Sequence, residues 1–352
     1  MKPCSATRYS RNTPEGQKAG RDLAGGFRGI LLFLSGDMDY LSKTLEMPRW
    51  SRNENLCSLC RCTKRGPLSY LYNSLASAKW ISEIWTASDW NAWPGRSPCP
   101  IFELWWLTGA NVFLDWMHVK YLGADQYIFG SVMYLICFVV LKEDNPKVNL
   151  AKVWGWIQEY YAQHKPTNRY RSLRKLTMFV RRKDFPKLRG KAAEIKGFGP
   201  VILYLWKKVM DEEDKVHRMI RLLLTKNLEL ETILDAHPTS MGYFCLPPTE
   251  AEKFKKTMFS VGQLHKQLSE HFTAKEIRVF NFTAKSHMLM HLGLLSKYIH
   301  PKLGWCFQGE GFMRTVQTLL QSCVRGNHAV QAMAKATVHY NLGKQLQYKK
   351  SG

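Results

Sequence analysis

The sequence contains three cysteines within six positions, in the segment NLCSLCRC that spans residues 55–62. Cys57 and Cys60 have the C-x-x-C spacing, which lets two thiolates from one tight turn bind the same metal ion. Zinc in structural sites takes four ligands, so two more ligands must come from elsewhere in the chain. A fold that contains such a site must bring a distant segment to this turn.

The two missing ligands are predicted to be His287 and His291, in the segment HMLMH. Their i, i+4 spacing puts both imidazoles on one face of a helix, about one turn apart. His287 follows Cys60 by 227 positions, a separation far larger than that within a zinc finger. Two alternatives stay open. The histidines could be partly buried, hydrogen-bonded rings of a core helix, and Cys62 or Cys99 could replace one of the four ligands.

The charge of the chain indicates the class of its partner. There are 51 Lys and Arg residues against 28 Asp and Glu residues, a formal net charge of +23. Such an excess indicates nucleic acid or an acidic membrane surface, although a merely soluble basic protein would share it. Nine cysteines scattered through 352 residues are typical of a reducing compartment, where paired cysteines bind metal more often than they form disulfides.

The densest basic tract spans residues 165–196 and holds twelve Lys and Arg residues. Tyr170, Phe179 and Phe185 are interleaved with these charges, so the tract is suited to phosphate contact with occasional base stacking. A solvated helix face is the competing interpretation. The residues predicted to contact nucleic acid are Arg169, Arg171, Arg174, Lys175, Arg181, Arg182 and Lys183.

The segment GILLFLSGDMDYL, residues 29–41, has an apolar run of strand length that ends in Ser-Gly-Asp. Buried strands end in this way at the edge of a sheet, and ligand-binding groups often follow the carboxyl ends of strands in open α/β sheets. Asp37 is therefore a candidate site residue. Its alternative role is the N-cap of a helix that begins at Met38.

The remaining pattern is helical from about Phe102 to about residue 280. The longest apolar run, Tyr127–Leu141, has fifteen residues. A membrane-spanning helix needs roughly 20, so we expect a buried core helix, with membrane insertion as the lesser alternative. A further helix from about Ala284 is expected to break at Pro301, and another to begin near Gly309.

Several short motifs follow one another in an ordered set. They are Asp37 after the expected strand, Cys57 and Cys60 about twenty residues later, D-x-x-H at Asp115 and His118, and HMLMH about twenty residues before Glu310. In order and spacing they resemble an RNase H-fold DDE transposase, most closely the CACTA (En/Spm) type, over roughly residues 29–325. The V(D)J recombinase resembles the same plan.

This resemblance implies an α/β fold with an RNase H-like core interrupted by a large all-helical insertion. The expected parts are a basic flexible tail (1–28), the first part of the core with the C-x-x-C motif (29–118), the helical insertion with the basic tract (119–280), and the second part of the core with the H-x-x-x-H motif, the Glu helix and a C-terminal tail (281–352). The first part of the tail could also pass for an organellar transit peptide. A structural zinc ion would join the two parts of the core.

In such enzymes three carboxylates hold two Mg²⁺ ions, which promote DNA cleavage and strand transfer by in-line phosphodiester displacement. The resemblance implies Asp37 as the second carboxylate and Glu310 as the third. The first should lie on an earlier strand, yet the only acids upstream are Glu15 and Asp22, in polar sequence without a strand. We therefore expect a relative of transposable-element transposases that is truncated at its N-terminus and inactive alone.

Asp115 and His118 open the expected insertion, and their role is left open between a structural contact, a helix cap and substrate contact. The expected partners are DNA and, in a homo-oligomer, further copies of the chain, with no membrane and a nuclear location. Three interpretations compete: a transposase-derived core, a non-catalytic zinc-stapled nucleic-acid-binding protein, and a membrane-associated helical protein.

Overall fold

The computed structural model describes residue 12 and residues 31–48, 54–70, 75–141, 143, 145–324 and 328–351. In the last two helices the side chains of residues 307–314, 329, 344 and 346–351 lie outside the description. By internal contacts the chain forms two units, residues 1–34 and 35–352. The expected basic tail, residues 1–28, lies outside the described residues except for Asn12.

Two short strands, β1 (Leu34–Gly36) and β2 (Val112–Leu114), pair in a small parallel sheet. β1 ends directly before Asp37 and β2 directly before Asp115, so both acids follow carboxyl ends at the same edge of the sheet. The chain is otherwise mostly helical, which is compatible with the α/β class only loosely. A two-stranded sheet does not establish an RNase H core, and that part of the expectation stays a proposal.

Residues 75–111 fold through short turns and isolated β-bridges rather than long elements, because prolines at positions 94, 98 and 100 interrupt regular backbone hydrogen bonding. Their short elements are η5 (Lys79–Ile81), α1 (Ala87–Asn91), η6 (Pro100–Glu103) and η7 (Gly109–Asn111). Trp80, Trp90 and Phe102 are at most 1% exposed and form much of the core here.

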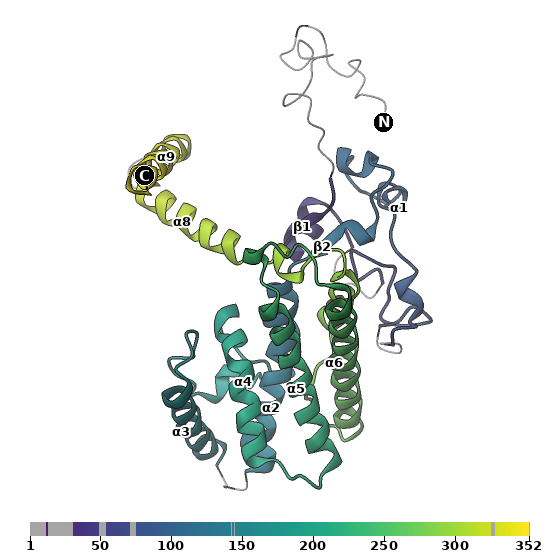
Figure 1. Cartoon of the computed structure of the whole chain (residues 1–352), viewed down its shortest axis with the longest axis vertical. Coiled ribbons are helices and arrows are strands. Elements are labelled where there is room, and N and C mark those ends of the chain that lie inside the picture. The colour runs from purple at the N-terminus through teal and green to yellow at the C-terminus, as the bar shows by residue number, and fades with distance from the viewer. Residues whose placement is uncertain are drawn as a thin grey trace. The chain divides into compact units, whose positions relative to one another are not determined.

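Long helices build most of the remaining structure (Figure 1). A continuous helix runs from Met117 to Val140, in which the π-helical segments η8 (Met117–Ala124) and η9 (Ile136–Val140) flank α2 (Asp125–Leu135). It is followed by α3 (Pro146–His164), α4 (Ala192–Val209), α5 (Lys215–Ala236), α6 (Pro248–Ala274) and α7 (Ala284–Leu295). α5 packs against both α4 and α6, and α6 packs against α7.

The helix 117–140 contains the apolar run of the sequence. Its 24 residues are long and apolar enough to cross a membrane by length and composition, but 72% of its most apolar window is buried inside the protein. Ile128, Phe129, Val132 and Met133 are at most 2% exposed. Packing against neighbouring helices therefore accounts for the apolar sequence, as expected of a core helix.

The connection between α3 and α4 differs from the expected all-helical insertion. Residues 165–191 are irregular apart from one 3-10 turn, η10 (Leu176–Met178). α3 ends at Lys165, which has a left-handed φ of 45°, and Pro166 and Pro186 cannot donate the backbone hydrogen bonds of a helix. The prediction of helix through this segment is wrong, and the basic tract is not a solvated helix face.

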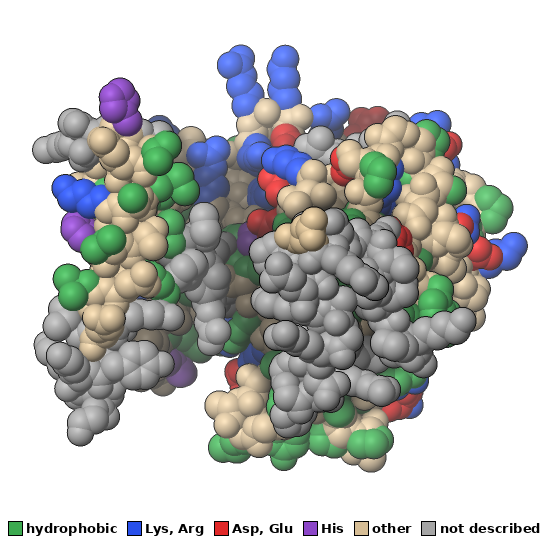
Figure 2. All heavy atoms as spheres, turned by 90° about the horizontal axis from the view of Figure 1, so that it is seen from above, with side chains coloured by type: hydrophobic (Ala, Val, Ile, Leu, Met, Phe, Trp, Pro, Cys, Tyr) green, Lys and Arg blue, Asp and Glu red, His purple; other side chains and the backbone are tan. Residues whose placement is uncertain are grey.

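Two helices follow a break after α7. The 3-10 turn η12 (Pro301–Gly304) marks the break predicted at Pro301, and α8 (Phe307–Val324) begins two residues before the predicted start. α8 packs against α9 (Ala329–Ser351) around buried Cys323, Ala332 and Ala336. Hydrophobic side chains of this helical hairpin also face outward (Figure 2), among them Val324, Val330, Met333, Val338 and Leu342.

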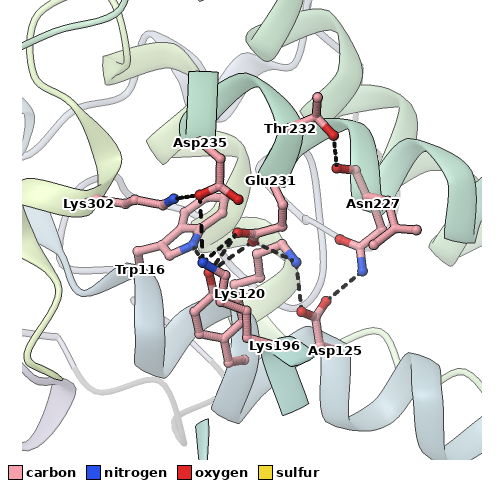
Figure 3. Close-up of polar contacts among 11 residues, drawn as sticks. Trp116, Lys120, Asp125, Lys196, Asn227, Glu231, Thr232, Asp235 and Lys302 are labelled. Atoms are coloured by element: carbon pink, nitrogen blue, oxygen red, sulfur yellow. Dashed lines mark hydrogen bonds and ion pairs between the residues drawn. The ribbon is translucent and has the colours of Figure 1, made fainter. Parts of the chain in front are cut away.

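A buried ionic network joins the helix 117–140 to α5 (Figure 3). Lys120, 2% exposed, places its Nζ atom 2.7 Å from Asp125 Oδ2 and 3.3 Å from Glu231 Oε1. Asn227 Nδ2 donates to Asp125 Oδ1 at 2.9 Å. Burial by itself would lower the pKa of Lys120, but the two carboxylates hold it above its usual value. The ammonium therefore stays charged inside the helical core.

Lys120→Met should lower the free energy of unfolding by roughly 3–5 kcal/mol, because it leaves the buried carboxylate of Asp125 without its cation. The matched control is Lys208→Met, since Lys208 pairs with Glu159 at 3.6 Å and its side chain is 38% exposed. Exposed ion pairs contribute little to stability, so this control should keep the parent unfolding midpoint. Urea denaturation compares the three proteins, and equal midpoints would show that the buried network carries no such role.

Candidate metal centre

Cys57 and Cys60 lie on a turn that is fixed from several sides. The N–H of Leu59 donates to Cys57 Sγ at 3.4 Å, and Trp85 Nε1 donates to the carbonyl oxygen of Cys57 at 2.9 Å. An antiparallel bridge pairs Cys60 with Ile84. Both thiols are fully buried. The tryptophan-rich segment thus sets the direction in which the two sulfur atoms point.

Gly109 lets another part of that segment lie directly against the turn. A Cβ atom at this position would lie 1.8 Å from the carbonyl oxygen of Leu59, which no other residue type could tolerate without a shift of backbone. The N–H of Gly109 donates to the carbonyl oxygen of Trp85 at 2.7 Å. The sequence gives no sign of this role for Gly109, since the approach depends on tertiary structure.

His287 and His291 lie one turn apart on α7, as their spacing predicts, and are 0% and 3% exposed. Trp80 packs edge-on against both rings, with centroid distances of 4.3 and 4.9 Å. The Tyr70 ring lies 5.8 Å from that of His287. Aromatic packing therefore orients the two imidazoles toward the cysteine turn.

The four predicted ligands come together in one buried group, with all ligand atoms within 4.8 Å of one another. Cys60 Sγ is 3.4 Å from His287 Nε2 and 3.2 Å from His291 Nε2, and the two Nε2 atoms are 3.2 Å apart. Zinc bonds of about 2.3 Å to sulfur and 2.0–2.1 Å to nitrogen give a tetrahedron with S–N edges of ~3.6 Å and N–N edges of ~3.3 Å. The measured edges fit one ion of this size.

The electrostatics of the group favour a divalent cation. Burial lowers the pKa of His287, so its ring is neutral and has a lone pair for a metal. Burial, with Cys57 beside it, raises the pKa of the Cys60 thiol well above its usual value. A bound divalent ion would offset two buried thiolates and leave the site neutral overall, which removes the cost of burying charge. The group could hold a metal such as zinc.

The alternative ligands Cys62 and Cys99 lie outside the four-residue group. Cys62 is buried next to the turn, and Cys99 is half-buried. The ligand set of that group is complete without them. The two histidines do approach each other within hydrogen-bond distance, but both rings also reach Cys60 Sγ, which is the arrangement that a shared ion requires.

The two predicted catalytic carboxylates have different outcomes. Asp37 Oδ1 accepts the N–H of Tyr40 at 2.6 Å, the helix-cap contact that was its alternative role. Among the described residues, Asp37 belongs to no group that could hold a metal. Glu310 lies near the start of α8, and its side chain lies outside the described residues.

Asp115 and His118 contact each other, and Cys306 joins them. His118 Nδ1 hydrogen-bonds to Asp115 Oδ2, and Asp115 Oδ1 accepts the N–H of Met117 at 2.9 Å. Both structural roles considered for this pair, an Asp–His contact and a helix cap, are therefore present. Cys306 lies 191 positions after Asp115, and no spacing rule could have linked the two.

The basic tract exposes most of its predicted contact residues. Those exposed to solvent are Arg169, Arg171, Arg174, Lys175, Arg182 and Lys183. Arg181 is partly buried and pairs with Asp184 at 2.6 Å. Tyr170 and Phe179 are 3% and 0% exposed, so the expectation that they stack on bases is wrong. They anchor the irregular tract to the helical core instead.

No family model matches this chain, and neither a curated protein nor a solved structure is significantly similar to it. The resemblance to CACTA-type transposases therefore rests on the residues themselves.

About one zinc ion per chain should be bound at this centre. Cys57→Ser or His291→Ala should remove that ion and lower the melting temperature by on the order of 10 °C, because a structural zinc ion stabilises the folded state strongly. Elemental analysis and thermal unfolding of the same samples give both quantities. Cys245→Ser, outside any metal-competent group among the described residues, is the control and should change neither. A zinc-free parent protein with an unaltered melting temperature would contradict the assignment.

Proposed function

We propose that this chain is a transposase-derived, zinc-stapled DNA-binding protein of the nucleus that does not cleave DNA by itself. The proposal rests on the close approach of Cys60 to His287 and His291, which follow it by 227 and 231 positions in the sequence. The CACTA-type plan needs this long-range junction, whereas a zinc finger takes all four ligands from one short segment.

The strand edge gives a second support. Asp37 and Asp115 follow two paired parallel strands, and the N–H of Cys306 donates to Asp115 Oδ1 at 3.1 Å. This bond tethers the start of α8, the helix that contains Glu310, to the same edge. In the parent family the third carboxylate comes from a helix packed across such an edge.

The basic tract supplies a surface for DNA. Its apolar residues point inward, with Leu173, Phe179 and Leu188 all 0% exposed, while its arginines and lysines reach solvent. An irregular segment anchored in this way can follow a phosphate backbone, and each phosphate neutralised by Lys or Arg releases counterions. The net charge of +23 adds attraction over longer distances.

The Mg²⁺ chemistry of the parent family is not matched by the described residues. Two metal ions need several carboxylates around them, and Asp37 has no second acid in a metal-competent group within the described part of the chain. The described residues therefore support no cleavage step by this chain. The helix-cap contact of Asp37 favours the second candidate, a non-catalytic nucleic-acid-binding protein that keeps the zinc staple.

Neutralising part of the tract should weaken DNA binding at every sequence. The triple change of Arg171, Arg174 and Lys175 to Gln should lower affinity and reduce the slope of log K against log salt by about 0.9 for each duplex phosphate that is no longer neutralised. A control of equal charge changes to Gln three exposed lysines on or beside α6, namely Lys253, Lys256 and Lys275. Equally weakened binding in both triple variants would show that net charge, and not the tract, determines binding.

The full chain should bind DNA without cutting it. With Mg²⁺ or Mn²⁺ present, nicking and strand transfer on labelled duplexes should not exceed those of buffer, and Asp37→Asn should behave like the parent. Cleavage by the parent that Asp37→Asn abolishes would overturn the inactive assignment and favour a working enzyme.

A further inference from the structure

Three metal-ligating side chains from separate parts of the fold meet at the end of β2. Asp115 follows the strand, His118 lies on the first turn of η8, and Cys306 comes directly before α8. One ligand atom from each lies within 4.8 Å of the other two. The group shares no residue with the Cys57 centre.

Asp115 is positioned as a ligand would be. Its side chain is fully buried, and its Oδ1 atom accepts the backbone N–H groups of Met117 at 2.9 Å and Cys306 at 3.1 Å. These bonds fix the plane of the carboxylate, and Oδ2 is hydrogen-bonded to His118 Nδ1. A metal ion bound to both atoms would replace the proton that they share. Hydrogen bonds of this kind, which orient a metal-binding group from behind, are typical of metal sites.

The fold also places Cys306 close to the strand by a specific contact. A Cβ atom on Gly304 would lie 2.1 Å from the Phe113 ring in β2, so the segment before α8 lies directly against the strand. A glycine at this position permits that approach, and Cys306 two residues later then reaches Asp115.

We propose that Asp115, His118 and Cys306 form a second metal site, for a borderline ion such as Zn²⁺ or Co²⁺, with a fourth position to which the described residues contribute no ligand. One oxygen, one nitrogen and one sulfur donor suit such ions, whereas Mg²⁺ prefers oxygen ligands alone. Three protein ligands leave a position for water or for an oxygen of a small anion, as in zinc sites that act on ligands. His118 is 25% exposed, so solvent can reach this position.

The second site is connected to the first through α7. Lys285 Nζ donates to the carbonyl oxygen of His118 at 3.0 Å and to that of Leu122 at 3.1 Å, and Lys285 precedes His287 by two residues. Loss of the first metal could therefore disturb the second. The test has to change the second site while the four ligands of the first stay intact.

The experiment uses the full chain, stripped of metal and reloaded with Zn²⁺ or Co²⁺. The parent should bind two ions per chain, and Cys306→Ser and His118→Asn should each bind one, with melting temperatures above that of Cys57→Ser. Cys245→Ser should keep two ions. Loss of one ion in the site variants alone assigns that ion to this group.

A second measurement separates ligand loss from misfolding. Cys306→Asp keeps a metal-binding side chain, so it should retain two Co²⁺ ions while the thiolate-to-cobalt charge-transfer absorption falls by about one third, from three thiolates to two. A parent that binds one ion only, lost in Cys57→Ser, would overturn the second site and leave the first intact. An unchanged charge-transfer band in Cys306→Asp would equally exclude Cys306 as a ligand. Neither outcome depends on DNA binding.

Discussion

Two cysteines on an irregular turn and two histidines on α7 meet in a buried cluster, and the three distances among Cys60, His287 and His291 fit the edges of a zinc tetrahedron. Bringing together groups 227 positions apart costs on the order of 5 kcal/mol in chain entropy, before any constant term. A structural zinc ion contributes on the order of 10 kcal/mol in small metal-folded domains, enough to offset that cost. The tryptophan-rich segment and α7 meet at this junction, because Trp85 and Gly109 fix the cysteine turn. α7 also packs directly against β2.

The helix 117–140 packs against α3, α4 and α7, and it combines an apolar surface with a buried charge. Burying the charges of Lys120, Asp125 and Glu231 costs a large desolvation free energy, so the network is weak evidence for net stability. Its effect is to fix one arrangement, since any sliding of α5 along this helix would leave an unpaired charge in the interior. The same network explains why so apolar a helix belongs to the core of this fold: Lys120 and Asp125 pair with each other, and Glu231 and Asn227 of α5 complete their contacts.

The two metal-competent groups differ in the chemistry that their surroundings allow. The Cys57 group has four ligands, is almost completely buried and is lined by aromatic rings, so it suits a structural ion. The Asp115 group has three ligands of mixed type and a partly exposed histidine at the edge of the sheet. The exposed basic tract elsewhere on the chain is the surface that we propose for polyanions, and it includes none of these ligands. The three proposed roles, a structural metal site, a ligand-accessible metal site and nucleic-acid binding, thus fall on separate residues.

The sequence by itself determined the features that depend on local spacing. The i, i+4 histidines of α7, the strand that ends before Asp37, the core helix and the break at Pro301 all follow from periodicity and from backbone chemistry. The motif order also selected the four ligands of the first centre. The irregular basic tract is also marked in the sequence, by Pro166 and Pro186. Only the tertiary structure decided that Cys306 joins Asp115 and that Tyr170 and Phe179 face the core. The reason is that these contacts depend on packing between distant segments, such as the close approach of Gly304 to the Phe113 ring, which leaves no periodic trace in the chain.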